Sequence, residues 1–206
     1  MSSISHCKAF QIKVLFPGFS TIKDDYMEAN CTCTLIKGPV NCIVDTMTAW
    51  DGARIVEALR ASGLRPEEID YVVCTHGHSD HIGGNYLFSN AIHIVGYSIS
   101  KGSKYFLTPD LSSGEEYQIA EGIKVVATPG HTLQDVTVLA NIGGKVYAVA
   151  GDLFEKEQDL DDDTIWKSAG SDDEDLQQKN RERILRIADF IIPGHGPMFA
   201  VPAAKK

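Results

Sequence analysis

The 206-residue chain lacks any run of about 18 consecutive apolar residues, the length that a membrane-spanning helix requires. Its first residues contain no basic segment leading into a long apolar stretch, as a secretory signal would. There is also no internal repeat and no low-complexity linker. We therefore expect one domain over residues 1–206, in a cytoplasmic protein that has no membrane partner.

Cysteine is scarce, and the five cysteines show no spacing typical of a disulfide framework: Cys7, Cys31, Cys33, Cys42 and Cys74. Disulfides are rare in the reducing compartments of the cell. We therefore expect free thiols and no disulfide.

Positive charge is scarce as well, because 19 Lys and Arg oppose 28 Asp and Glu, a net charge of −9. This balance disfavours nonspecific binding of nucleic acid. The acid is concentrated, since residues 155–175 hold ten acidic and two basic residues, leaving 17 basic and 18 acidic residues elsewhere. We expect the acids of 155–175 to form a solvated loop. The remaining residues are nearly neutral in net charge, so an anionic substrate is not excluded.

Short β-branched and apolar runs bounded by Gly, Pro or Asn predict ten strands. They cover 10–16, 33–37, 40–44, 71–74, 91–95, 117–120, 123–127, 136–140, 145–149 and 190–192. A turn at Gly143 and Gly144 predicts a hairpin between 136–140 and 145–149. Residues 101–113 are predicted to form a loop that joins two strand-rich halves.

Two helices are predicted from their caps and apolar spacing. The first covers 50–62, with Thr48 as its cap and with Ala53, Val56 and Leu59 facing inward. The second covers 171–188, and its inward residues are Leu176, Ile184, Ile187 and Ala188. The pattern predicts an α/β protein in which two packed sheets carry helices on the outside.

The densest group of ligand-type residues directly follows the predicted strand 71–74. Residues 75–84 read Thr-His-Gly-His-Ser-Asp-His-Ile-Gly-Gly, so His76, His78, Asp80 and His81 fall within six positions. Small residues between them allow the loop to curl, and imidazole with carboxylate is a ligand set for zinc and related metals. Although a lone His-x-His is often a surface accident, four such residues at this spacing predict a metal site.

Three further candidates each follow a predicted strand: His131 follows 123–127, Asp152 follows 145–149 and His195 follows 190–192. Side chains at several strand ends can meet at one rim of a sheet sandwich. The two remaining histidines have ordinary interpretations, since we expect His6 to be solvated and His93 to be structural.

The motif His-x-His-x-Asp-His, followed in order by a histidine, an aspartate and a histidine, resembles the metallo-beta-lactamase superfamily over nearly the whole chain. The resemblance implies an αββα sandwich of two mixed sheets with helices on the outer faces. It also implies two divalent metal ions, with zinc expected. The implied ligands are His76, His78 and His131 for one ion and Asp80, His81 and His195 for the other, with Asp152 as the bridge. Asp45 matches a family acid near the site, and we expect it to orient the ligand loop.

Several residues of this chain differ from those of other superfamily members, and these differences disfavour some of the activities found in the superfamily. The commonest antibiotic-hydrolysing enzymes have cysteine in place of Asp152, and the diiron flavoproteins have glutamate in place of His78, so both activities are disfavoured. Because 11 residues follow His195, we expect no carboxy-terminal helical domain like that of glyoxalase II. We also expect no cap domain between His131 and His195.

The residues flanking the motifs, such as Pro-Gly-His-Thr and Pro-Gly-His-Gly-Pro, resemble a capless branch of the superfamily that cleaves RNA. That resemblance implies an endoribonuclease of the histone pre-mRNA 3′-end processing type. It further implies a homodimer of the cytosol and nucleus whose substrate is single-stranded RNA or another small anion. We expect Asp80 and Asp152 to be catalytic, because metal-bound carboxylates can align the attacking water and relay its proton.

Two kinds of substrate contact are candidates outside the metal ligands. Trp166 is a candidate for stacking on a base. Arg181, Arg183 and Arg186 are candidates for phosphate contacts, or else form a solvated helix face. Two alternative functions stay open: a glyoxalase II-like thioester or other small-ester hydrolase, and a metal-binding scaffold without turnover.

Overall fold

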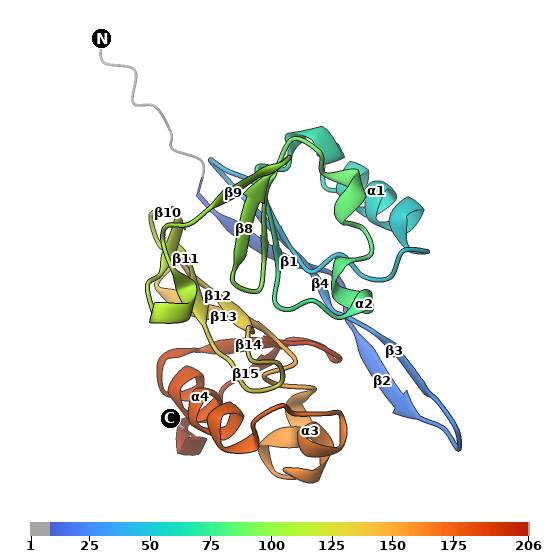
Figure 1. Cartoon of the computed structure of the whole chain (residues 1–206), viewed down its shortest axis with the longest axis vertical. Helices are drawn as coiled ribbons and strands as arrows, with labels where there is room; N and C mark the ends of the chain where they lie inside the picture. The colour runs from blue at the N-terminus through green and yellow to red at the C-terminus, as the bar shows by residue number, and fades with distance from the viewer. Residues whose placement is uncertain (1–8, 206) are drawn as a thin grey trace.

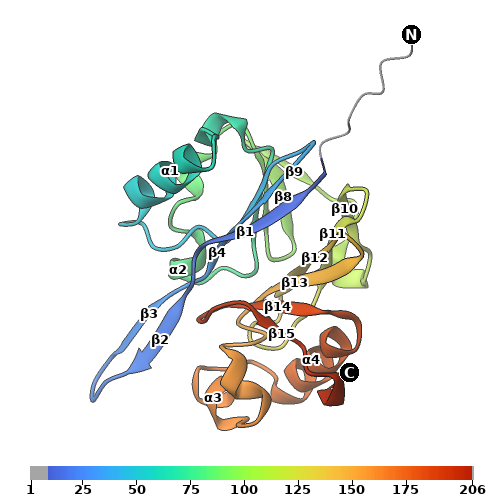
Figure 2. The ribbon, with the colours of Figure 1, turned by 180° about the vertical axis from the view of Figure 1, so that it is seen from behind.

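The apolar runs of the sequence form two facing β-sheets in the computed structural model, which describes residues 9–205 (Figure 1). Helices lie on the outer sides of the sheets, and the view from behind shows the same layering (Figure 2). The predicted αββα sandwich is confirmed. His6 and Cys7 lie outside the described residues.

The first sheet has seven strands in the order β1-β4-β5-β6-β7-β8-β9. Its strands are β1 (Gln11–Phe16), β4 (Cys33–Lys37), β5 (Cys42–Val44), β6 (Tyr71–Cys74), β7 (Ile92–Val95), β8 (Ser98–Lys101) and β9 (Lys104–Phe106). The pairs β5·β6 and β6·β7 are parallel, and the other pairs are antiparallel. Helix α1 (Gly52–Ala61) connects β5 to β6 across the outer face.

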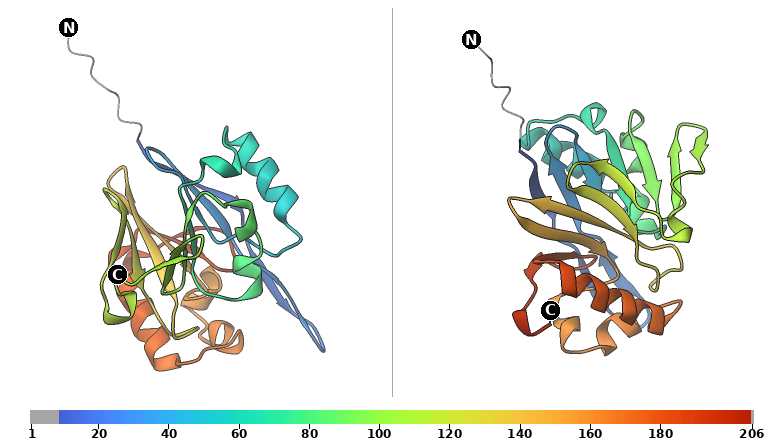
Figure 3. Two further views of the ribbon diagram at one scale, coloured as in Figure 1. Left: turned by 45° about the horizontal axis from the view of Figure 1, so that its top comes forward. Right: turned by 90° about the vertical axis from the view of Figure 1, so that its left-hand side faces the viewer.

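The second sheet has six strands in the order β10-β11-β12-β13-β14-β15. Its strands are β10 (Tyr117–Ala120), β11 (Ile123–Ala127), β12 (Val136–Ile142), β13 (Lys145–Gly151), β14 (Phe190–Pro193) and β15 (Phe199–Ala200). The single parallel pair in this sheet is β13·β14. Helices α3 (Thr164–Ser168) and α4 (Glu174–Ile187) lie between β13 and β14 in sequence and on the outer face of the sheet in space (Figure 3).

Successive residues of the central strands point to opposite faces and so supply different cores. On β5, Val44 packs in the layer between the two sheets, whereas Ile43 packs in the layer under α1. On β6, Val73 and Val72 divide in the same way. Burial on both faces explains why these strands appear in the sequence as continuous apolar runs. A third core lies between the second sheet and α4.

Five strands lie outside the predicted runs. Strands β2 (Phe19–Ile22) and β3 (Met27–Asn30) form a hairpin that projects from the body (Figures 1 and 2). Strands β8 and β9 form a second hairpin, so the prediction of a loop over 101–113 is wrong in part. The fifth is the two-residue edge strand β15. None of the described helices is long and apolar enough to span a membrane.

The helix faces differ from the prediction. In α1 the buried residues are Gly52, Ile55 and Leu59, whereas Ala53 is exposed. Thr48 is not the cap, because its hydroxyl instead donates to the carboxylate of Asp51, 2.6 Å away.

On the second predicted helix Ile184 and Ala188 are buried as predicted, but the rest of the buried face of α4 is polar. Its buried residues are Gln177, Asn180, Arg181 and Ile184, and Ile187 is 46% exposed. The helix begins later than predicted, with Asp173 as the N-cap that accepts a hydrogen bond from the Leu176 amide.

The acidic segment 155–175 is folded rather than a uniform solvated loop. Asp159 is buried and forms an ion pair with Arg181, with 2.9 Å between Oδ1 and Nη2. Arg181 lies over the ring of Trp166, whose side chain is only 1% exposed. The predicted roles of Trp166 in stacking on substrate and of Arg181 in binding phosphate are therefore wrong, because both side chains are enclosed in this cluster.

The described cysteines and His93 have structural roles. Four cysteines, Cys31, Cys33, Cys42 and Cys74, are buried free thiols. His93 on β7 lies 2.9 Å from the carbonyl oxygen of Phe88 through Nε2, as expected of a structural histidine.

Replacing Asp159 with alanine should lower the free energy of unfolding by about 3 kcal/mol, because it leaves the buried Arg181 guanidinium without its counter-charge. The matched control is Glu157→Ala, which removes an exposed carboxylate from the same turn and should change stability by less than about 0.5 kcal/mol. Urea denaturation measures both. Equal losses for the two variants would contradict a stabilising role for the ion pair.

Candidate metal centre

The loops after five strands meet at one edge of the sandwich. Asp45 follows β5, the His76–His81 segment follows β6, His131 follows β11, Asp152 follows β13 and His195 follows β14. The segment after β6 includes the short helix α2 (Ser79–Ile82). All seven predicted ligand residues converge here, in two groups whose ligand atoms lie within 4.8 Å of one another: His76, His78, His131 and Asp152 in the first, and Asp80, His81 and His195 in the second.

In the first group, Nδ1 of His78 lies 2.9 Å from Nε2 of His76 and 3.1 Å from Nε2 of His131. The carboxylate of Asp152 completes the group, with Oδ2 at 3.6 Å from His76 and 3.3 Å from His131. Three imidazole nitrogens and one carboxylate oxygen facing one point form a donor set that suits a divalent metal.

In the second group, Nε2 of His81 and Nε2 of His195 each lie 3.9 Å from Oδ2 of Asp80. Asp152 adjoins this group too, because its Oδ1 lies 3.2 Å from His81 and its Oδ2 lies 3.3 Å from His195. One carboxylate therefore touches both groups, as a bridging ligand would.

Burial and charge act in opposite directions on the pKa values in this cluster. Burial lowers the pKa of His76 well below its usual value, and the neighbouring His81 lowers it further. Burial alone would raise the pKa of Asp152, but the imidazoles of His81, His195 and His76 outweigh it and hold that pKa well below the usual range. Asp152 is thus an anion, the form that binds metal.

The second nitrogen of most of these rings has its own partner. Nδ1 of His131 lies 2.7 Å from the carbonyl oxygen of Gly170, and Nδ1 of His195 lies 3.1 Å from that of Asn30. Nδ1 of His81 lies 3.1 Å from Oδ2 of Asp45. A proton on Nδ1 that is donated to these oxygens leaves the lone pair of Nε2 free to bind a metal.

Asp45, which the sequence predicts to orient the ligand loop, contacts that loop directly. Its backbone has a φ of 57°, in the left-handed region that aspartate tolerates better than most residues. Its carboxylate accepts hydrogen bonds from the amide and the hydroxyl of Thr75, with the amide at 2.8 Å. Asp45 therefore fixes both the start of the histidine loop and the orientation of His81.

The glycine of the Pro-Gly-His motif is required by close packing. A Cβ atom at Gly194 would lie 1.8 Å from Oδ1 of Asp152, which is a severe steric clash. Only glycine lets the loop after β14 approach Asp152 closely enough to bring His195 into the site.

Residues of α4 and of the acidic segment support the centre without any signal in the sequence. Gln177 donates to the carbonyl oxygen of Asp152 at 2.9 Å, and Asn180 donates to that of Pro129 at 2.7 Å. Glu155 is buried near His195, and burial together with Asp152 raises its pKa to about 8. Only the folded chain brings these residues beside the ligand loops.

Two buried atoms of the ligand groups lack hydrogen-bond partners within the described part of the chain, which is consistent with a bound cation. They are Nε2 of His81 and Oδ1 of Asp152, which lie 3.2 Å apart. Buried polar atoms are rarely left unsatisfied, and a metal between them would satisfy both. The fold and the cluster indicate divalent metal binding, whereas the role of each individual ligand stays a prediction.

The edge of the sandwich is hollowed on two sides of the cluster. A pocket of about 320 Å³ borders His78 and is lined also by Gly96, Leu133 and Gln134. Another, of about 430 Å³, lies between the β2–β3 hairpin and α3 and borders Glu155.

A family model of the metallo-beta-lactamase superfamily matches residues 27–195, which include all seven residues of the two groups. Fold, site and family model agree, and the chain belongs to the metallo-beta-lactamase superfamily. It is 41% identical over 196 residues to metallo-beta-lactamase domain-containing protein 1 of Xenopus laevis, covering 92% of this chain and 81% of that protein.

The human protein of the same name is 38% identical over 167 residues, covering 80% of this chain. The chain spans only 60% of that human relative's length, so a single domain over residues 1–206 without further domains stays a prediction.

Solved structures of low identity support the same fold. A metallo-beta-lactamase-type protein of Thermotoga maritima superposes with a TM-score of 0.67 at 23% identity, covering 93% of this chain and 99% of its own. An N-acyl homoserine lactone hydrolase, solved with N-hexanoyl-L-homoserine at its catalytic metal centre, has a TM-score of 0.66 at 17% identity, with coverages of 92% and 93%.

Protein loaded with excess zinc should retain about two ions per chain, because each ligand group can hold one ion. His195→Ala should retain about one, since it removes a ligand of the second group only. His93→Gln, which alters a histidine outside the site, should retain two. Metal analysis after desalting measures this, and a wild-type value of one under excess zinc would contradict two sites.

Asp45→Asn should weaken metal binding about tenfold, because the amide no longer supports His81 with a negative charge. Asparagine tolerates the left-handed backbone and still accepts a hydrogen bond from the Thr75 amide, so the fold should persist. Competition with a chelator measures metal affinity, and thermal unfolding of the metal-free protein serves as the control. Unchanged affinity would exclude the positioning role.

Proposed function

We propose that the protein is a binuclear, zinc-dependent hydrolase that cleaves phosphodiester bonds in single-stranded RNA. The observation that carries the hydrolase is the contact of Asp152 with both ligand groups, since one carboxylate serving two donor sets is an arrangement of two-metal hydrolases. The donor set of imidazole and carboxylate supports zinc.

Two divalent cations bound at this centre would lower the pKa of a bound water and neutralise charge on a substrate oxygen. The chain's own carboxylates then have different roles. The side chain of Asp80 is 20% exposed and is reachable by water, whereas that of Asp152 is 5% exposed. Asp80 can therefore accept the proton of an attacking water, and Asp152 holds the two ligand groups together.

The choice of RNA rests on the motifs around His131 and His195, which resemble the capless RNA-cleaving branch. The hollows beside the cluster support it, because a flexible strand needs an open approach from two sides. The same resemblance supports an endoribonuclease of the histone pre-mRNA processing type that acts as a homodimer in the cytosol and nucleus. These finer assignments are part of the proposal.

An ester or thioester hydrolase is the second candidate, and a specific observation favours it. The lactone hydrolase of similar fold holds the product of ester hydrolysis at its metal centre. An N-acyl homoserine lactonase of Bacillus cereus is also 32% identical over 100 residues, although these cover only 44% of this chain. The same attacking water would act on a carbonyl carbon in place of phosphorus.

A parallel assay of the zinc-loaded protein on a short single-stranded RNA, on S-lactoylglutathione and on N-hexanoyl-homoserine lactone tests the proposal. We expect cleavage of the RNA at a rate that exceeds turnover of the other two. Preference for either ester would replace the proposal with the second candidate, and no turnover of any substrate would favour a metal-binding scaffold.

Asp152→Asn should reduce the rate on the preferred substrate by a factor of about 1,000 or more, because a neutral amide cannot serve two cations. The shape of the side chain is preserved, so the thermal midpoint of the metal-free protein should fall little. Glu157→Gln, which alters an exposed acid of the same segment, should leave the rate unchanged. A similar rate for Asp152→Asn and wild type would refute a catalytic centre at this position.

A further inference from the structure

A cationic face of α4 lies beside the metal centre. Lys179, Arg183 and Arg186 stand at i, i+4 and i+7, a spacing that puts three side chains on one face of a helix. All three line a pocket of about 430 Å³, together with Tyr97 and Pro129. Among the described residues that line this pocket, none carries a carboxylate.

Within the described chain none of the three cations forms an ion pair with a carboxylate. Burial lowers the pKa of Arg183, although Glu116 is close enough to act in the opposite direction and raise it. Asp175 and Glu182 are at i,i+4 spacing from Lys179 and Arg186, but among the described residues neither carboxylate forms an ion pair with these cations. Glu182 instead accepts a hydrogen bond from Gln178. Like charges at i,i+4 repel one another, so a bound anion would relieve the repulsion between Lys179 and Arg183.

The pocket is joined to the metal centre through the backbone. Pro129 lines the pocket and lies two residues before His131. Its carbonyl oxygen accepts the hydrogen bond from Asn180, which also lines the pocket. One turn earlier, Gln177 holds the carbonyl of Asp152. The same helix thus holds both ligand loops and presents cations next to them.

We propose that this pocket binds phosphate groups of the RNA strand on one side of the cleaved bond, an inference that rests on the proposed function. Guanidinium groups match the geometry of phosphate oxygens, and lysine adds a point charge. Tyr97, half-buried in the same pocket, offers a ring on which a base stacks. Arg183 is partly anchored, because its guanidinium donates to the carbonyl oxygen of Ala127.

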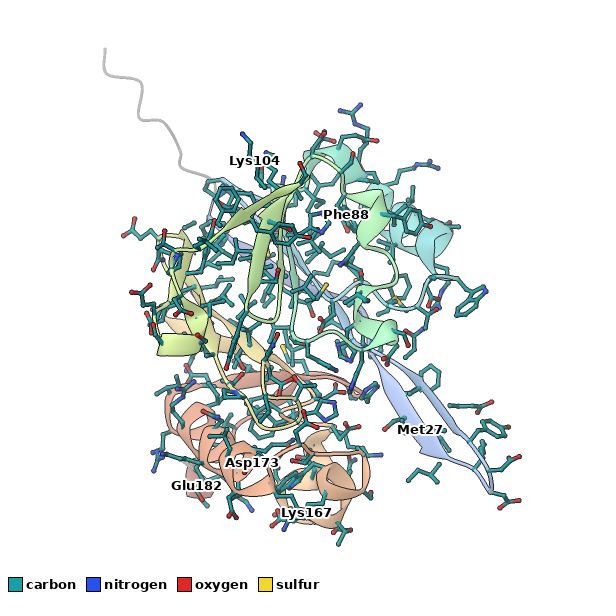
Figure 4. The ribbon with its side chains drawn as sticks, viewed as in Figure 1. Met27, Phe88, Lys104, Lys167, Asp173 and Glu182 are labelled. Carbon is teal, nitrogen blue, oxygen red and sulfur yellow. The ribbon has the colours of Figure 1, made fainter. Side chains whose placement is uncertain are left out.

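The test removes the two cations that make no hydrogen bond within the described chain, in the double variant Lys179→Gln/Arg186→Gln. Its control, Lys101→Gln/Lys104→Gln, removes the same charge from the β8–β9 hairpin. Figure 4 shows Lys104 at the opposite end of the molecule from Glu182 of α4. The probe is a single-stranded RNA of ten nucleotides with phosphorothioate linkages, which resist hydrolysis, and its binding to the zinc-loaded protein is followed by fluorescence anisotropy across a salt titration.

The double variant should bind the probe about tenfold more weakly than wild type. Its plot of log affinity against log salt should be shallower by about 1.4, since each phosphate contact to a single strand contributes a slope of about 0.7. The control should keep the wild-type affinity and slope. The amount of zinc bound should be the same in all three proteins, because none of the four substituted residues belongs to the ligand groups.

The outcomes separate this inference from the proposed function. If wild type binds the probe, the double variant does not, and wild type cleaves no RNA, the phosphate-binding pocket is supported and the nuclease activity is rejected. Cleavage of RNA with equal binding by wild type and the double variant would reject the pocket and retain the nuclease. An equal loss in the control would show a general charge effect and reject the pocket, and absence of both binding and cleavage in wild type would reject both.

Discussion

The buried carboxylate of Asp152 is the constraint around which the site is organised. It lies within 3.6 Å of the Nε2 atoms of four histidines, which enter from the three loops after β6, β11 and β14. Its position depends on the register between β13 and β14, which shifts at the end of the pair so that Gly151 stands opposite Pro193. Such irregularities at strand ends redirect side chains, and here the shift brings the residues after both strands together.

Helix α4 connects this centre to the outer layer of the fold through polar contacts. An ordinary covering helix would bury an apolar stripe, but α4 buries Gln177, Asn180 and Arg181 together with Ile184. Each polar side chain donates to a partner, although Oε1 of Gln177 accepts from none within the described chain: the first two hold the carbonyl oxygens of the ligand loops, and Arg181 pairs with Asp159. Buried polar groups are tolerated when they are hydrogen-bonded. The helix therefore buries less apolar surface than an ordinary covering helix, and its polar side chains instead hold the ligand loops in place.

The sequence predicts the sandwich and the convergence of the ligand residues because both depend on local signals. Doubly buried strands are continuous apolar runs, and the histidines and aspartates directly follow them. Features that depend on a distant partner were missed. Nothing near Arg181 indicates that Asp159 would neutralise it, and Trp166 is enclosed by the same pair. The β2–β3 hairpin was missed because its apolar side chains, such as Met27 in Figure 4, are exposed and follow no burial pattern.

The fold also shows why the net charge of −9 says little about the charge at any one site. Part of the acidic segment 155–175 faces inward, because Asp159 neutralises Arg181 and Glu155 is buried beside the ligand cluster. The cations of the following helix point to a separate pocket without carboxylates. Charge is thus distributed unevenly over these neighbouring elements, and electrostatic interactions between exposed charges are screened within about 10 Å. An anion at the edge of the sandwich therefore experiences the local arrangement of charge more strongly than the total.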